Sequence, residues 1–159
     1  LIRRQRQMCI RDRYNCENVI VRDIFWNYTA KKAVYGRVYG VPIRGKLLFT
    51  RLFVRVSEIG FMLEGFCIKM SNCQVEGQGA SLVMAYIYSL VEVENCLFVD
   101  TTDSKNQIGI KLTQGWNLIR GCSFVGLGVG VDVNGKGSCV ITGCVFFNSS
   151  TESSISPIL

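Results

Sequence analysis

The chain has 159 residues, of which 48% are apolar, and its 18 basic and 12 acidic side chains give a formal charge of +6. This apolar content is sufficient for one packed domain and excludes a disordered chain. No apolar run reaches the roughly 18 residues that a membrane-spanning helix requires, so no membrane insertion is predicted. The chain contains no histidine, which excludes mechanisms built on a histidine base or a histidine metal ligand within this segment.

Residues 1–13 carry five arginines and one aspartate and match no pattern found later in the chain. They lack the apolar centre of a signal peptide and resemble conceptual translations of sequencing-adapter read-through, so we predict a disordered, non-native leader. A basic arm that binds nucleic acid is the alternative. Without the leader, 13 basic and 11 acidic residues remain, and the other basic and aromatic residues form no single stripe. We therefore predict no nucleic-acid partner.

From residue 19 onward a short pattern recurs: apolar, any, apolar, any, polar or glycine, one apolar or cysteine position, any, apolar. The apolar or cysteine position is occupied in chain order by Ile24, Leu52, Cys73, Cys96, Cys122 and Cys144. The steps between these residues are 28, 21, 23, 26 and 22 residues. A repeat of this length with variable insertions is typical of a solenoid, in which each unit packs on the next.

Each copy of the pattern predicts two short strands joined by a sharp corner. Val91 and Val93 alternate with polar residues and face inward, and the alternation restarts out of phase at Cys96. The predicted corner residues are Asp23, Arg51, Asn72, Asn95, Gly121 and Gly143. Five of these six are of the Asn, Asp or Gly types that tolerate a left-handed backbone. We expect the stacked Asn72 and Asn95 to hydrogen-bond to neighbouring coils.

A third strand is predicted before each of the later copies, at residues 60–63, 83–86, 109–112 and 130–133. Three strands per turn, each pairing in parallel with the next coil, predict an all-β fold. It is a right-handed parallel β-helix of about six coils over residues 14–150, followed by a truncated tail at residues 151–159. A leucine-rich repeat, which has a different spacing before its asparagine and a helical segment per unit, and a β-sandwich are the alternatives.

Four cysteines occupy the same position of the pattern, and we predict that they form an internal ladder. These residues are Cys73, Cys96, Cys122 and Cys144. Neighbouring coils lie about 4.8 Å apart, which suits a disulfide, but parallel side-chain directions oppose one, so we expect free thiols. The sequence has neither a Cys-x-x-Cys pair nor a histidine, so we predict no metal and no cofactor.

Residues 109–125 and 91–98 resemble right-handed β-helix proteins of the pectate lyase superfamily, most of all bacteriophage tailspike and tail-fibre proteins. The resemblance covers about residues 14–150. It implies a polysaccharide ligand, a homotrimer, and a location in the phage virion or outside the cell. The clustered aspartates and Gly-His-Gly of polygalacturonases are not present in this sequence, nor are the grouped calcium-binding carboxylates of pectate lyases.

In the proteins that this chain resembles, saccharides lie along the face of the third strand and the loop before it. The predicted outward positions on that face are Met62, Ala85, Lys111 and Asp132. Lys111 and Asp132 occupy matching positions of adjacent coils. They form either a cross-strand ion pair that supports the sheet or part of a binding surface, with Lys111 as a ligand-binding residue.

The loop at residues 99–107 is the longest of the loops that precede a third strand. Inverting glycosidases need two carboxyl groups about 6.5–9.5 Å apart, and this loop together with the next coil can supply them. The predicted catalytic residues are Asp100, Asp103 and Asp132. An ordinary solvated turn is the alternative. Lys105, and Gln78 in the loop one coil earlier, are predicted to extend the binding wall.

Trp116 lies in a predicted turn, where its indole either stacks on a sugar ring or folds over the apolar end of a coil. Trp26 is predicted to be core, and Glu92 and Glu94 to be solvated charges. We predict a segment that binds bacterial surface polysaccharide, with or without depolymerising it. A secreted polysaccharide lyase or glycoside hydrolase and a structural spacer are the alternatives.

Overall fold

The computed structural model describes residues 18–37, 45–64, 66–77, 81–85, 90–102, 107–147 and 151–155. This part of the chain consists of strands and turns, without a helix. The strands are β1 (Asn18–Arg37), β2 (Gly45–Glu64), β3 (Phe66–Ser71), β4 (Gln74–Gly77), β5 (Ser81–Ala85), β6 (Leu90–Glu94), β7 (Leu97–Asp100), β8 (Ile108–Arg120), β9 (Ser123–Val125), β10 (Val129–Thr142), β11 (Val145–Phe147) and β12 (Thr151–Ile155). The predicted leader lies outside the described residues.

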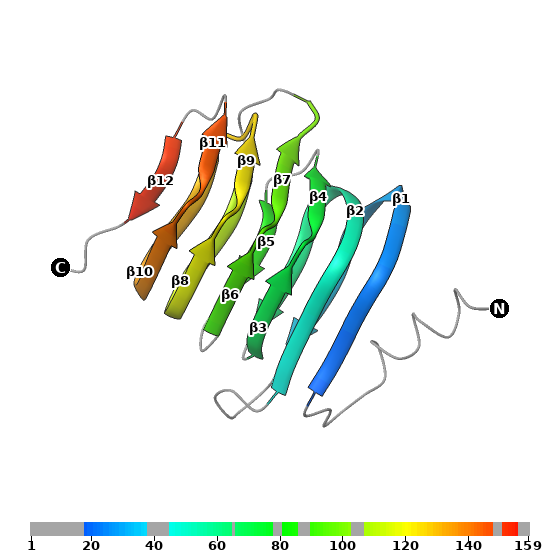
Figure 1. Ribbon diagram of the computed structural model, residues 1–159, viewed down its shortest axis with the longest axis horizontal. Helices are drawn as coiled ribbons and strands as arrows, with labels where there is room; N and C mark the ends of the chain where they lie inside the picture. The colour runs from blue at the N-terminus through cyan, green and yellow to red at the C-terminus, as the bar shows by residue number, and fades with distance from the viewer. Residues whose placement is uncertain are drawn as a thin grey trace.

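The strands form three walls in which every pairing is parallel. The first wall contains the beginnings of β1 and β2, then β3, β6, and the ends of β8 and β10. The second wall contains the middle of β1 and β2, then β4, β7, β9 and β11. The third wall contains the ends of β1 and β2, then β5, the beginnings of β8 and β10, and β12. The predicted parallel β-helix is confirmed, and its coils follow one another from the N-terminal to the C-terminal end (Figure 1).

Parallel pairing places equivalent residues of successive coils directly over one another. In the first wall the registered inward residues are Val21, Phe49, Met70, Val93, Ile119 and Ile141. The four in the middle are buried, whereas Val21 and Ile141 at the two ends are partly buried. The interior is therefore a set of columns of side chains. Successive residues of a column lie about 4.8 Å apart, and each packs against its counterparts in the neighbouring coils.

The corner between the first and second walls has the same backbone in every coil. All six predicted corner residues have a positive φ, and the prediction is confirmed. These angles are 57° at Asp23, 52° at Arg51, 53° at Asn72, 50° at Asn95, 60° at Gly121 and 61° at Gly143. The backbone N–H groups of Asn72 and Asn95 donate to the next coil over 3.1 and 3.0 Å. Their carboxamides make no hydrogen bond to a described residue, so the coils are joined here by the backbone.

The thiols that follow these corners point into the interior. Cys73, Cys96 and Cys122 are buried, and Cys144 in the last of these coils is partly buried. The backbone N–H of Cys73 donates to Sγ of Cys96 over 3.4 Å, and the Cys96 thiol donates to the carbonyl of Glu94 over 3.2 Å. The six described cysteines are free thiols.

Candidate functional site

The outward column of the third wall is the predicted binding face. Its registered residues are Met62, Met84, Lys111 and Asp132. Ala85 was predicted at this position, but it is in register with the buried Leu63 and Leu112. The prediction for Ala85 is therefore wrong by one residue, which in a strand exchanges the inward for the outward face.

Lys111 and Asp132 meet on this face. The Nζ of Lys111 lies 3.9 Å from Oδ2 of Asp132, and the two side chains are 30% and 17% exposed. Each alternates with buried residues of its own strand, so the parallel register brings the two charges together. A partly exposed pair of this kind contributes a fraction of a kcal/mol, up to about 1 kcal/mol, to stability. The cross-strand ion pair expected from the sequence is thus present.

Asp100 is buried at the end of β7, in the second wall. Its Oδ1 accepts hydrogen bonds from the backbone N–H and the hydroxyl of Thr102, both over 2.7 Å, and from Nε2 of Gln107 over 2.6 Å. The same Gln107 nitrogen donates to the carbonyl of Gly77 in the preceding coil over 2.8 Å. These bonds hold the two ends of the loop together and join the loop to the coil beneath it.

This arrangement separates the predicted catalytic residues. Asp100 anchors the loop from the second wall, whereas Asp132 faces outward from the third wall beside Lys111. The third predicted carboxylate, Asp103, lies outside the described residues, as do Lys105 and Gln78. The described residues therefore place the Lys111–Asp132 ion pair on the third wall, and the catalytic assignment stays a prediction.

Trp116 projects from the turn between the third and first walls. The turn contains Gly115, whose φ of 103° is disfavoured for residues with a side chain. The buried side chain of Asn117 donates to the carbonyls of Gly115 and Ser138, both over 3.1 Å. The indole itself is 73% exposed, so it does not cover the interior of a coil. It is a large aromatic surface held on a hydrogen-bonded turn.

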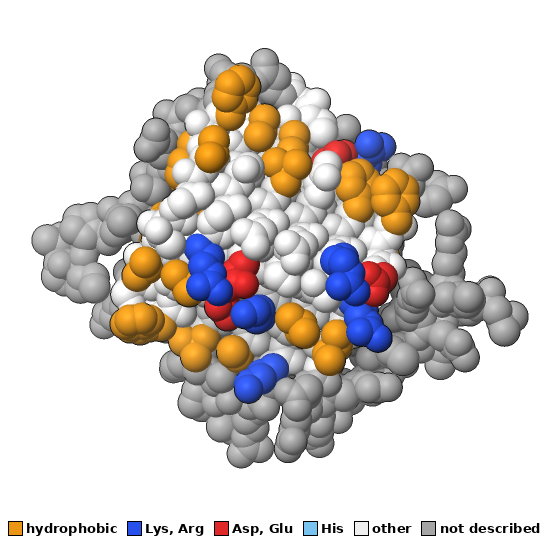
Figure 2. All heavy atoms as spheres, in the orientation of Figure 1, with side chains coloured by type: hydrophobic (Ala, Val, Ile, Leu, Met, Phe, Trp, Pro, Cys, Tyr) orange, Lys and Arg blue, Asp and Glu red, His pale blue; other side chains and the backbone are white. Residues whose placement is uncertain are grey.

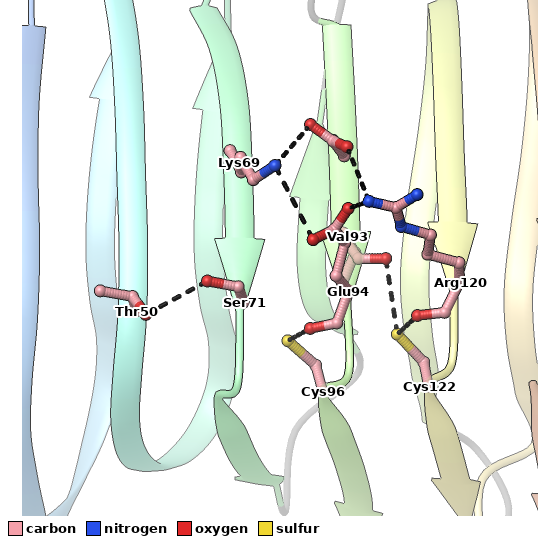
Figure 3. A network of polar contacts seen from close by, with 9 residues as sticks. Thr50, Lys69, Ser71, Val93, Glu94, Cys96, Arg120 and Cys122 are labelled. Atoms are coloured by element: carbon pink, nitrogen blue, oxygen red, sulfur yellow. Dashed lines mark hydrogen bonds and ion pairs between the residues drawn. The ribbon is translucent and has the colours of Figure 1, made fainter.

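The first wall carries a network of four charged residues on its outer face (Figure 3). Nζ of Lys69 lies 3.1 Å from a carboxylate oxygen of Glu92 and 3.7 Å from one of Glu94, and Arg120 pairs with both glutamates. Glu94 is only 14% exposed, so the prediction of a solvated charge is wrong for this residue. Burial raises the pKa of Glu94, but hydrogen bonds with Glu92 and Arg120 and the charge of Lys69 outweigh burial and leave the pKa below its ordinary value.

This network balances two acids with two bases, which suits a structural role. The backbone of Trp26 is in register with that of the buried Val54, and its predicted place in the core stays a prediction. Among the residues that the structure describes, no three His, Cys, Asp or Glu side chains converge as metal ligands would. The described segments also include no helix with the length and apolarity needed to cross a bilayer.

Comparison with known families agrees with this architecture. Residues 41–156 match the family described as the right-handed β-helix region, and this match covers more than half of the chain. The chain therefore belongs to the right-handed β-helix region family. The match extends to β12, whose pairing with β10 continues the third wall beyond residue 150. Comparisons with curated proteins and with solved structures gave no match.

Proposed function

We propose that this β-helix binds bacterial surface polysaccharide along the third wall, as one segment of a tailspike-like protein. The observation that carries the proposal is the exposure of Trp116, which leaves 73% of its surface in solvent on a fixed turn. Exposing a large aromatic side chain forgoes the stabilisation that burial would bring. An indole in this position offers an apolar face for the C–H surface of a sugar ring.

The adjoining third wall supplies polar groups for the hydroxyls of the same polymer. Lys111 precedes Trp116 by five residues on β8, and its ion pair with Asp132 lies on the outward face of that wall. Because the coils repeat at a spacing of about 4.8 Å, side chains of successive coils form a row along the solenoid axis. A row of this kind suits a linear polymer better than a compact small molecule.

Recognition accounts for the described residues better than cleavage does. Oδ1 of Asp100 accepts three hydrogen bonds that hold the ends of the loop, which gives this carboxylate a structural role. Asp132 is paired with Lys111 on the outward face of the third wall, whereas Asp100 ends a strand of the second wall. Polysaccharide binding is therefore the function proposed for the chain.

The tailspike-like assignment extends to assembly and location. It predicts a homotrimer, in which other copies cover part of the outer walls, located in a virion or outside the cell. Sedimentation analysis of the purified chain tests the assembly, and a monomer at micromolar concentration would contradict this part of the proposal.

The central test is binding to an array of purified bacterial capsular polysaccharides and O-antigens, followed by affinity measurement on each hit. We expect Trp116→Ala to weaken binding at least tenfold without lowering the thermal midpoint, because the side chain makes few internal contacts. Phe147→Ala is the matched control, since it removes another exposed aromatic side chain (67% exposed) from a different wall.

Equal loss of affinity in both variants, or no loss in Trp116→Ala, would contradict the proposal. Release of new reducing ends from a bound glycan, abolished by Asp132→Asn, would instead identify the chain as a depolymerase.

A further inference from the structure

A groove of about 510 Å³ runs along the corner between the first and second walls. It is open to solvent and follows the row of corner residues across successive coils, so its axis is the axis of the solenoid. This corner is distinct from the third wall and from the turn that carries Trp116. Figure 2 shows that charged side chains on this face of the molecule lie in separate groups, with surface that is neither charged nor hydrophobic between them.

Two stacked phenylalanines line one flank of the groove. The rings of Phe25 and Phe53 lie 4.7 Å apart at an interplanar angle of 15°, and Phe25 is 70% exposed. The guanidinium of Arg55 lies 5.5 Å from the centroid of the Phe53 ring, and its Nε donates a hydrogen bond to the Glu76 carboxylate over 2.7 Å. Phe53 is thus in contact with Arg55 while Phe25 remains accessible.

Side-chain amides also line the groove. Asn72 and Asn95 are exposed corner residues of adjacent coils, and both line the groove. Within the described part of the chain their carboxamides have no hydrogen-bond partner. Each carboxamide offers two N–H donors and one carbonyl acceptor, which is the combination that recognises vicinal hydroxyl groups.

The remaining polar residues of the groove balance in charge. Arg51 donates to the Asp23 carboxylate from Nε over 2.6 Å and from a terminal guanidinium nitrogen over 3.0 Å. This hydrogen-bonded pair lowers the pKa of Asp23 and raises the pKa of Arg51, so both remain charged and neutralise each other. A groove without net charge favours an uncharged ligand over a uronate or a phosphate.

We infer that this groove is a second glycan-binding site, for a polymer of neutral pyranoses that lies along the solenoid axis. The exposed Phe25 contacts the apolar face of one sugar, and the carboxamides of Asn72 and Asn95 bond to hydroxyls of the following sugars. Their spacing of about 4.8 Å, set by the coils, is comparable to the length of one pyranose unit. The site uses no residue of the third wall, so it does not depend on the function proposed above.

The chain offers a matched control for this site. Val145 occupies the same outward register position as Phe25, at the far end of the second wall, and it is 59% exposed. Phe25→Ala and Val145→Ala therefore remove equivalent exposed apolar side chains, but only the first lines the groove. Asn72→Gly removes a carboxamide while keeping a residue that tolerates the positive φ of 53°.

The experiment measures affinity of the full chain and its variants for each glycan that binds on the capsular polysaccharide and O-antigen array. We expect at least one hit built only of neutral sugars, whose affinity falls tenfold or more in Phe25→Ala and severalfold in Asn72→Gly. Val145→Ala should bind as the wild type does, and all three variants should keep the wild-type circular dichroism spectrum.

The two sites fail in distinguishable ways. If Phe25→Ala and Asn72→Gly both bind every hit with wild-type affinity, the groove is not a glycan-binding site, even where Trp116→Ala weakens binding. A loss in Phe25→Ala together with wild-type affinity in Trp116→Ala would support the groove and contradict the third-wall proposal. The proposed groove site would also be contradicted if every hit carries acidic sugars, or if no glycan on the array binds.

Discussion

Two aromatic stacks lie on opposite faces of the second wall. Phe25 and Phe53 stack on the outer face at 4.7 Å and 15°. Phe124 stacks inside the coil, on Phe98 at 5.2 Å and 12° and on Phe146 at 4.9 Å and 8°. The geometries are nearly the same because the parallel register, with its spacing of about 4.8 Å, places equivalent residues one above another on either face.

The difference between the stacks lies in what surrounds them. Phe98 and Phe124 are fully buried, whereas Phe25 is 70% exposed. Stacking alone therefore carries no information about function in this fold, since the backbone imposes it. Burial decides the role: the inner stack stabilises the solenoid, and the outer stack is available to a ligand.

The comparison is tested most strongly by removing one ring from each stack. We expect Phe124→Ala to lower the free energy of unfolding by about 4 kcal/mol, because it leaves a cavity between two rings in a closed interior. Phe25→Ala should change it by about 0.5 kcal/mol or less, as is usual at exposed positions. Urea unfolding followed by circular dichroism measures both. Equal losses would show that the outer stack is also structural and would remove the basis for a ligand site there.

A smaller effect is expected at the corners that precede the inner stack. Gly121 and Gly143 have nearly the same φ, at 60° and 61°. A Cβ on Gly121 would lie 2.5 Å from Oδ1 of Asn95, whereas on Gly143 the nearest atom, the backbone nitrogen of Gly121, lies 3.8 Å away. We expect Gly143→Ala to cost about 1 kcal/mol from its backbone alone, and Gly121→Ala about 2 kcal/mol.

The additional cost at Gly121 should depend on Asn95, which a double-mutant cycle measures. Combined with Asn95→Ala, the cost of Gly121→Ala should fall to that of Gly143→Ala. If the cost of Gly121→Ala is unchanged in the Asn95→Ala background, the corner asparagine does not pack on the next coil, and its side chain has no structural role at that end.

The smallest effect concerns the thiol of Cys139, which lies in the first wall just before the corner at Gly143. Burial, with a further contribution from Cys144, raises the pKa of Cys139 from its ordinary value of 9.0 to about 11. In the unfolded chain this thiol loses its proton near its ordinary pKa, so the stabilising difference is present below pH 9 and is lost as the pH rises towards 11. Urea midpoints should fall more between pH 8 and pH 10 in the wild type than in Cys139→Ser. Equal falls would show that Cys139 is as accessible in the folded as in the unfolded chain.

Much of this fold follows from local pattern. The alternation of Val91 and Val93 fixes which side of a strand faces inward, and the place of a residue in the repeat identifies the corners of positive φ, including Arg51, whose residue type does not. The outer stack could also have been predicted from the sequence. Phe25 and Phe53 both follow the apolar position of the repeat, where any residue is allowed, and two aromatic residues there in adjacent copies indicate an exposed pair.

The site was less predictable, because its residues depend on contacts between coils. From the sequence, Asp100 could be a catalytic carboxylate or part of an ordinary turn, and only the structure shows that Thr102 and Gln107 donate hydrogen bonds to its Oδ1. The placement of Ala85 failed because a strand without a clear alternation does not reveal its register, which the neighbouring β2 and β8 decide.

The sequence by itself determined the period of the coil, the inward columns and the corners, because each depends on residues at most a few positions apart. Only the tertiary structure decided which side chains remain exposed, as Trp116 and Phe25 do, and which charges find partners, as Glu94 does. Exposure and pairing depend on residues one coil away, twenty or more positions along the chain, and the strand alternation within one coil does not specify those neighbours.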